Sequence, residues 1–96
     1  MLPLTTDLSD LDGVPYFLWN EPTTVRRLRE ILSDPENVMR PLYAARLMRE
    51  GRVLDVWQFL TLQDILALWP QVERHMGRRR DFWRFLLDTW KEIGAL

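Results

Sequence analysis

Apolar residues recur at helical spacing along most of the chain. In residues 23–34, TTVRRLREILSD, the apolar side chains fall within a stripe of about 120°, and the charged ones lie elsewhere on the helix surface. Thr23 or Thr24 can cap this helix, and Arg26 can pair with Glu30 one turn later. This segment therefore predicts a helix with one buried face.

A second helical segment runs from Asp34 to Gly51. Its start has the order Asp-Pro-Glu that often begins a helix, but Pro41 interrupts the pattern. The helix therefore either kinks at Pro41 or begins its regular part near Arg40. Apolar side chains then point nearly all round the helix, which suits a central position in the fold or contact with a partner.

Shorter helices are expected in the middle of the chain. Asp55 can cap a short turn, and Thr61 and Asp64 have the spacing of a capping box for a longer helix. Pro70 either ends that longer helix or restarts it, so one or two further turns are expected before Gly77.

Residues 79–93, RRDFWRFLLDTWKEI, predict the last helix, which Gly94 closes. Its apolar side chains span about 200° of the helix circumference, whereas one buried stripe needs about 100°. Either this helix lies at the centre of the fold, or the aromatic residues near the N-terminus or another chain cover part of its surface.

The N-terminal residues lack a helical pattern. Residues 1–13, MLPLTTDLSDLDG, are expected to form an acidic leader that is extended or weakly ordered, because proline, glycine and turn-forming residues interrupt it. In the aromatic stretch that follows, Tyr16, Phe17 and Trp19 can insert into a groove between helices. The chain is therefore predicted to be all-α, with a single compact domain of four to five short helices in residues 14–96 after the leader.

Aromatic residues can compensate for the thin core of so short a chain. The 96 residues are 47% apolar and 28% charged, and a domain of this size buries about 60–65% of the surface of its unfolded chain. Five tryptophans can each remove about 150–250 Å² from water. The aromatic core is expected to contain Tyr16, Phe17, Trp19, Trp57, Trp69, Phe82, Trp83 and Trp90.

The sequence offers little material for catalysis or targeting. It has no cysteine, which excludes disulfides and thiol catalysis and favours a cytoplasmic protein. No basic residue precedes an apolar run near the N-terminus, and no apolar run approaches the ~20 residues of a membrane helix, so no membrane span is expected. His75 is the only histidine and lacks the partners of a catalytic or metal site. We expect no catalytic residue, cofactor or metal.

Charge is unevenly distributed, although the net charge is −1. The acidic residues of the leader are Asp7, Asp10 and Asp12. The main basic cluster, in GRRRDFWR, consists of Arg78, Arg79, Arg80 and Arg84. This cluster can be a solvated surface, a contact for an acidic protein or a contact for nucleic acid, and the apolar helix beside it disfavours nucleic acid. Twelve of the thirteen basic residues are arginine, through codon bias or for planar pairing with carboxylates or phosphates.

Three blocks of the sequence resemble a group of small helical proteins of bacteria and archaea. The blocks are YFLWN followed by TVRRLREIL, then YAARLMREGRVLDVWQFLT, then GRRRDFWRFLLDTWKEIG, and they cover residues 16–94. The group has an aromatic-Trp-Asp opening and a centre of the form AR-L-(R/E)-x-x-R-x-x-DVW. Asn20 stands where the group more usually has Asp. Its members are often encoded beside nucleotidyltransferase-like toxins of the AbiEii type.

This resemblance implies a non-catalytic protein–protein interaction module, antitoxin-like or accessory to a nucleotidyltransferase-type toxin. Under this hypothesis the residues that contact the partner are Asp7, Asp10, Asp12, Arg78, Arg79, Arg80 and Arg84. One alternative is a small DNA-binding regulator in which residues 61–69 and 79–93 form a helix-turn-helix. Another is a self-associating helical protein, a homo-oligomer without a dedicated partner.

Overall fold

Five α-helices carry the fold in residues 4–94, the part of the chain that the computed structural model describes. They are α1 (Val25–Ser33), α2 (Arg40–Glu50), α3 (Val53–Val56), α4 (Leu62–Val72) and α5 (Arg80–Glu92). Three 3-10 turns accompany them: η1 (Tyr16–Leu18), η2 (Glu73–His75) and η3 (Gly77–Arg79). Two short parallel strands are β1 (Leu4–Thr5) and β2 (Val14–Pro15). The predicted all-α fold is confirmed.

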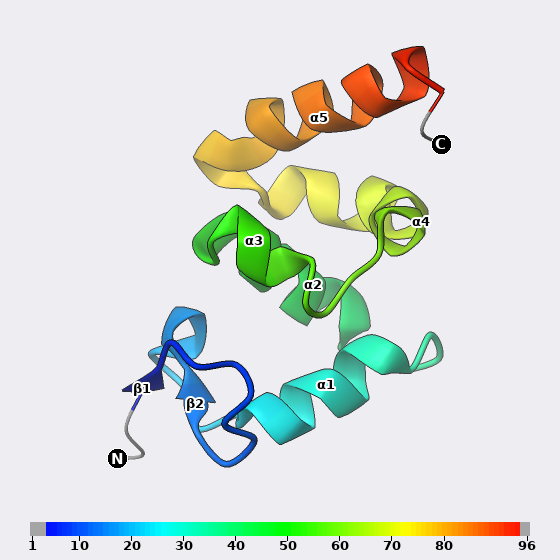
Figure 1. Ribbon diagram of the computed structural model, residues 1–96. Coiled ribbons are helices and arrows are strands. Elements are labelled where there is room, and N and C mark those ends of the chain that lie inside the picture. Colours follow the sequence, from blue (N-terminus) through cyan, green and yellow to red (C-terminus); the bar gives the residue numbers. More distant parts are fainter. Residues whose placement is uncertain (1–3, 95–96) are drawn as a thin grey trace.

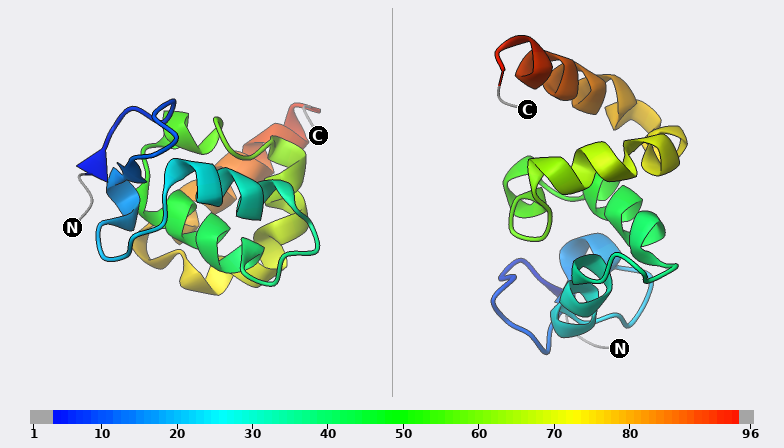
Figure 2. Two further views of the ribbon diagram at one scale, coloured as in Figure 1. Left: turned by 90° about the horizontal axis from the view of Figure 1, so that it is seen from below. Right: turned by 90° about the vertical axis from the view of Figure 1, so that its right-hand side faces the viewer.

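The helices are stacked along one long direction (Figure 1). The strands and α1 lie at one end of the molecule, α5 lies at the other, and α2 lies between them. The molecule measures 44 × 27 × 23 Å along its principal axes. Figure 2 shows from two further sides that α5 is an outer layer, and its main neighbours along the chain are η2 and η3.

The N-terminal segment is part of the packed body rather than a separate leader. Leu4 of β1 lies opposite Val14 of β2, and Leu8 between the strands is buried in the core. The backbone N–H of Val25 donates to the Gly13 carbonyl at 2.9 Å, which joins the segment to α1. The boundary predicted after residue 13 therefore does not separate two parts of the fold. Residues 1–3 of the predicted leader lie outside the described residues.

The aromatic stretch after β2 enters the core through Phe17 and Leu18, which are buried, while Tyr16 is half-buried. Trp19, which was predicted to insert beside them, is 62% exposed. The reason is that η1 ends at Leu18, so the next side chain leaves the packed face. Arg46 of α2 lies over the Trp19 ring, with its guanidinium carbon 5.4 Å from the ring centroid.

α1 begins as predicted, but its charged side chains pair differently. The Thr24 hydroxyl caps the helix by accepting the Arg27 backbone N–H at 3.2 Å. The predicted pair of Arg26 with Glu30 is wrong. Arg27 pairs with Glu30 at 3.0 Å, and Arg26 turns toward Asp12 of the N-terminal segment at 3.2 Å. The packing of that segment along α1 brings Asp12 within reach.

α2 has the central position that its apolar pattern suggested. Its regular part begins at Arg40, one of the two predicted alternatives. It packs against α1 on one side and α4 on another, and η1, η2 and η3 also contact it. The buried side chains of α2 are Ala44, Ala45, Leu47 and Met48. Two of these are alanines, which allow neighbouring elements to approach the helix closely.

Asp55 was predicted to cap a short turn, but it lies buried within α3 and joins α3 to the N-terminal region. The Tyr16 hydroxyl donates to the Asp55 carboxylate at 2.5 Å, and Arg52 donates to the same oxygen at 2.9 Å. The Tyr16 oxygen in turn accepts the Arg52 backbone N–H at 2.7 Å. Partial burial of Tyr16 raises the pKa of its hydroxyl.

α4 confirms the predicted capping box and continues beyond the predicted break. The Thr61 hydroxyl accepts the Asp64 N–H at 3.1 Å, and the Asp64 carboxylate accepts the Thr61 N–H at 2.9 Å. Pro70 lies inside the helix, which runs on to Val72, so the predicted end or restart at Pro70 is wrong. Pro70 removes one helical hydrogen bond, and burial of Leu68 and Val72 on either side holds the helix together.

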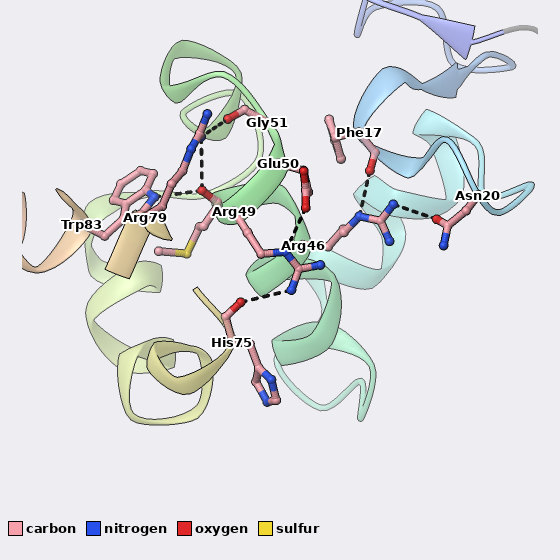
Figure 3. A network of polar contacts seen from close by, with 10 residues as sticks. Phe17, Asn20, Arg46, Arg49, Glu50, Gly51, His75, Arg79 and Trp83 are labelled. Atoms are coloured by element: carbon pink, nitrogen blue, oxygen red, sulfur yellow. Dashed lines mark hydrogen bonds and ion pairs between the residues drawn. The ribbon is translucent and has the colours of Figure 1, made fainter. Parts of the chain in front are cut away.

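Arginine side chains tie the ends of these short elements to one another, and Figure 3 shows three such ties. In each tie a guanidinium donates to a backbone carbonyl of another element. The pairs are Arg29 with Leu8, Arg40 with Leu32, Arg46 with Phe17, Arg49 with His75, and Arg79 with Gly51. Apart from Leu8, which lies between the two strands, these carbonyls lie at or near the end of a helical element, where they lack a partner within the helix, and arginine supplies the missing donor. Much of the arginine excess therefore serves the fold.

Candidate protein-interaction surface

One side of α5 exposes large apolar side chains. Phe82 is 43% exposed, Phe85 67% and Ile93 70%. Together with the half-buried Leu86 they lie within about 100° on the helix surface, so they form one stripe. We call these four residues the α5 face. The sequence left three ways to cover the wide apolar surface of α5: a central position in the fold, the N-terminal aromatic residues or another chain. In the structure, neither of the first two covers the α5 face.

The opposite side of α5 anchors the helix to the body. Trp83 is fully buried, and its indole N–H donates to the Met48 carbonyl at 2.9 Å. Trp57 packs edge-on against Trp83 and Trp90, with ring centroids 5.9 and 5.4 Å apart. Leu87, one turn beyond Trp83, is also buried. The α5 face is therefore presented on a helix that is held in place from behind.

Three exposed carboxylates follow the outer edge of the α5 face. Asp81, Asp88 and Glu92 lie within about 40° of one another on the helix surface, next to Phe85. None of the three forms an ion pair with another residue in the range 4–94. We call them the acidic edge. The charge pattern of the sequence pointed to the basic cluster instead. The acidic edge could have been found from the spacings of seven and four residues between Asp81, Asp88 and Glu92 on the predicted helix.

Next to the acidic edge, α5 also stands partly clear of α4. A groove of about 370 Å³ lies between the two helices, and its apolar lining includes Leu66, Trp69 and Leu87. Asp88 and Lys91 of α5 also border the groove. α5 therefore contacts the body along a narrow row centred on Trp83.

The predicted basic cluster does not form a single patch. Arg79 is half-buried and donates to the Gly51 carbonyl, so it serves the fold (Figure 3). Arg80 and Arg84 both pair with one oxygen of Glu73, at 2.7 and 3.2 Å. Arg78 is exposed. The sharing of Glu73 reduces the positive charge that the cluster offers to a partner.

The predicted acidic contacts of the leader lie at the other end of the molecule from α5 (Figure 1). The Asp7 carboxylate accepts the Ser9 hydroxyl at 2.5 Å and the Ser9 N–H at 3.0 Å, which lowers the pKa of Asp7. Asp12 pairs with Arg26, and Asp10 is exposed. These carboxylates stabilise local turns and α1, and the structure does not bring them together with the basic cluster.

The residues predicted for the aromatic core have three different environments. Phe17 and Trp83 are buried. The half-buried residues that pack against the core are Tyr16, Trp57, Trp69 and Trp90. Trp19 and Phe82 do not belong to the core, because Trp19 follows the last residue of η1 and Phe82 lies on the α5 face.

The described residues offer little sign of other kinds of site. No group of three His, Asp or Glu side chains that could hold a metal ion occurs in residues 4–94, and His75 is exposed. Within the same residues, no helix has the length and apolar character needed to cross a membrane. Comparison with family models, with curated proteins and with solved structures finds no match to this chain. The geometry of α5 is therefore the main guide to function.

Proposed function

We propose that this protein is a non-catalytic interaction module that binds another protein through the α5 face. The observation that carries the proposal is the exposure of Phe85 and Ile93, beside Phe82, on a helix that Trp83 anchors from behind. Large aromatic and aliphatic side chains dominate the centres of protein interfaces, and an exposed apolar patch rimmed by polar residues is typical of such interfaces. Rigid anchoring lowers the entropy that binding costs.

The resemblance noted in the sequence suggests a nucleotidyltransferase-type toxin as the partner. This chain then acts as an antitoxin or as an accessory subunit, and the α5 face is its main contact. Arg78 and the leader carboxylates Asp7, Asp10 and Asp12 lie outside the α5 face. They are at most secondary contacts in a complex of this kind.

The DNA-binding alternative has less support from the arrangement of the helices. α4 and α5 would form the helix-turn-helix, but residues 73–79 separate them, which is longer than the usual turn of 3–4 residues. The outer side of α5 presents Phe85 and the acidic edge, and carboxylates repel phosphates.

The proposal is tested by mixing the purified chain with the products of the neighbouring genes and measuring molar mass by light scattering. We expect a stable complex with the wild type and none with Phe85→Glu, since a buried carboxylate at the centre of the interface is costly. Val38→Glu is the matched control, because Val38 is 88% exposed and lies in the loop between α1 and α2, away from α5 (Figure 1). Circular dichroism establishes that each variant keeps its helices.

Three results would count against the proposal. One is a complex that persists with Phe85→Glu, and another is a homodimer, without any hetero-complex, that depends on Phe85. The third is salt-sensitive retention of DNA that is lost in Arg78→Ala/Arg79→Ala/Arg80→Ala, which favours the regulator instead. Absence of a complex with either neighbour would remove the toxin as the suggested partner.

A further inference from the structure

Asp81 in the first turn and Lys91 in the last turn of α5 suit the helix dipole, but other charges of the helix are placed unfavourably. Asp88 and Glu92 are four residues apart, a spacing at which like charges repel on a helix. Glu92 also lies in the last turn, where the helix dipole favours cations, and Arg80 lies in the first turn, where it favours anions. The acidic edge is thus a row of carboxylates that cationic neighbours outside α5 would stabilise.

Basic residues of α5 lie near one member of the acidic edge, because Arg84 and Lys91 are four and three residues from Asp88 and border the same groove. Lys91 is the basic residue of the last turn, but its direction on the helix differs from that of Glu92 by about 100°. Lys91 forms no ion pair with a carboxylate in residues 4–94, and Arg80 and Arg84 are held by Glu73. The side of α5 next to Phe85 therefore carries three carboxylates, none of which forms an ion pair within residues 4–94.

We infer that the α5 face binds an apolar segment of the partner that carries lysine or arginine along the side that faces the acidic edge. This inference rests on the proposed function and specifies the chemistry of the partner. The α5 face extends from Phe82 to Ile93, about 16 Å along the helix, which matches a partner helix of about three turns. Apolar contact supplies the affinity, and the basic flank fixes the orientation of the partner.

A second copy of this chain, packed antiparallel on the α5 face, fits the acidic edge poorly. Two copies of α5 packed antiparallel about a two-fold axis bring the same edge of each helix together, so Asp81 of one copy faces Glu92 of the other. Like charges placed opposite each other in an interface disfavour that pairing. A basic partner converts the same carboxylates into favourable contacts.

The inference is tested with two synthetic helical peptides of about 14 residues that share one leucine stripe. Lysines flank the stripe in one peptide, and glutamates flank it in the other. Fluorescence anisotropy measures the binding of each labelled peptide to the wild-type chain. We expect the lysine peptide to bind about tenfold more tightly at low salt, as three exposed charge pairs predict, and the difference to shrink at about 0.5 M salt.

Two triple variants separate a local effect from the net charge. Asp81→Asn/Asp88→Asn/Glu92→Gln should weaken binding of the lysine peptide about tenfold and leave the glutamate peptide no weaker. The control Asp7→Asn/Asp10→Asn/Asp12→Asn removes the same number of charges at the other end of the molecule and should leave both affinities within about twofold. Phe85→Ala should weaken the binding of both peptides.

The outcomes distinguish this inference from the proposed function. If the two peptides bind with equal affinity and Phe85→Ala abolishes the binding of both, the α5 face remains a binding surface. The inference that the partner carries a basic flank is then overturned. Failure of the lysine peptide to bind at about 100 μM also overturns the inference. The complex with the product of a neighbouring gene tests the proposed function independently. Self-association through Phe85, measured by sedimentation, overturns the choice of a basic partner over a second copy.

Discussion

α2 and α5 share a wide apolar pattern and have different environments in the fold. Both carry apolar side chains over more of their circumference than one buried stripe requires. α2 lies between α1 and α4, so its own chain covers it, whereas α5 lies at one end and is packed along a single row. The width of an apolar pattern therefore shows how much of a helix needs covering. The position of the helix in the fold decides whether other parts of the same chain can cover that apolar surface.

The two helices also use arginine differently. On α2, Arg46 donates to the Phe17 carbonyl and Arg49 to the His75 carbonyl, so each connects two elements (Figure 3). On α5, Arg80 and Arg84 share Glu73 at the surface. Hydrogen bonds to otherwise unpaired carbonyls stabilise more than exposed ion pairs do. We therefore expect the centre of the molecule to be more rigid than α5.

The largest effect is expected at the row that anchors α5. Trp83→Ala should lower the free energy of unfolding by about 3–5 kcal/mol, because it empties a fully buried indole site. Urea denaturation measures this change. Trp83→Phe keeps most of the packing, loses the bond to the Met48 carbonyl and should cost about 1 kcal/mol. A loss below about 1 kcal/mol for Trp83→Ala would show that α5 is not anchored there.

A smaller effect is expected for the arginine ties of α2. Arg46→Met keeps an unbranched apolar side chain but leaves the Phe17 carbonyl without its donor, and it should lower the free energy of unfolding by about 1–2 kcal/mol. The matched change on α5, Arg84→Met, should cost less than about 0.5 kcal/mol, because Glu73 keeps Arg80. Equal losses in denaturant unfolding would contradict the contrast between the two helices.

Tyr16→Phe tests the connection between η1 and α3. Loss of the hydroxyl, which donates to Asp55 and accepts the Arg52 N–H, should cost about 1 kcal/mol near neutral pH. Because burial raises the pKa of Tyr16 above its unfolded value near 10, this stabilisation is complete below pH 10 and decreases as the pH rises through the folded value.

Unfolding measured between about pH 9 and 11 should therefore show a smaller alkaline loss for Tyr16→Phe than for the wild type. Tyr43, whose pKa is also raised by partial burial, should account for part of the loss that the variant retains. An unchanged alkaline slope would mean that the Tyr16 hydroxyl has similar surroundings in the folded and unfolded chains.

The smallest effect is expected on the α5 face itself. Phe85→Ala should change the free energy of unfolding by no more than about 0.5 kcal/mol, because the ring is largely in water. In hydrogen exchange, the amides of α5 should also open more readily than those of α2. A decrease in the free energy of unfolding above about 2 kcal/mol would show that Phe85 belongs to the core, which would contradict its place on an exposed binding face.

The sequence predicts best those parts of the fold that local rules control. The cap at Thr24, the capping box of Thr61 and Asp64, and the closing Gly94, whose φ is +75°, depend only on neighbouring residues. Packing overrides local rules elsewhere. The clearest case is Pro70, which remains helical because its neighbours are buried.

Contacts between distant residues explain the remaining differences. Asp55 accepts a hydrogen bond from Tyr16, thirty-nine positions away, so no local pattern reveals its role. Leu8 lies among polar residues without helical spacing, and its burial depends on the pairing of β1 with β2. For the candidate site, the wide apolar pattern of α5 indicated uncovered surface. The basic cluster was predicted as a contact for a partner, because nothing in the sequence shows that Glu73 lies beside Arg80 and Arg84.

The row of indoles behind α5 gives the protein an intrinsic optical probe. Trp57 contacts both Trp83 and Trp90, and Trp90 is half-buried close to the α5 face. A bound partner that excludes water from Trp90 should shift its emission to shorter wavelength without any added dye. Trp19, at the other end of the molecule, contributes a solvent-exposed background that Trp19→Phe removes. The rings that fasten the helix can thus also signal when it is covered.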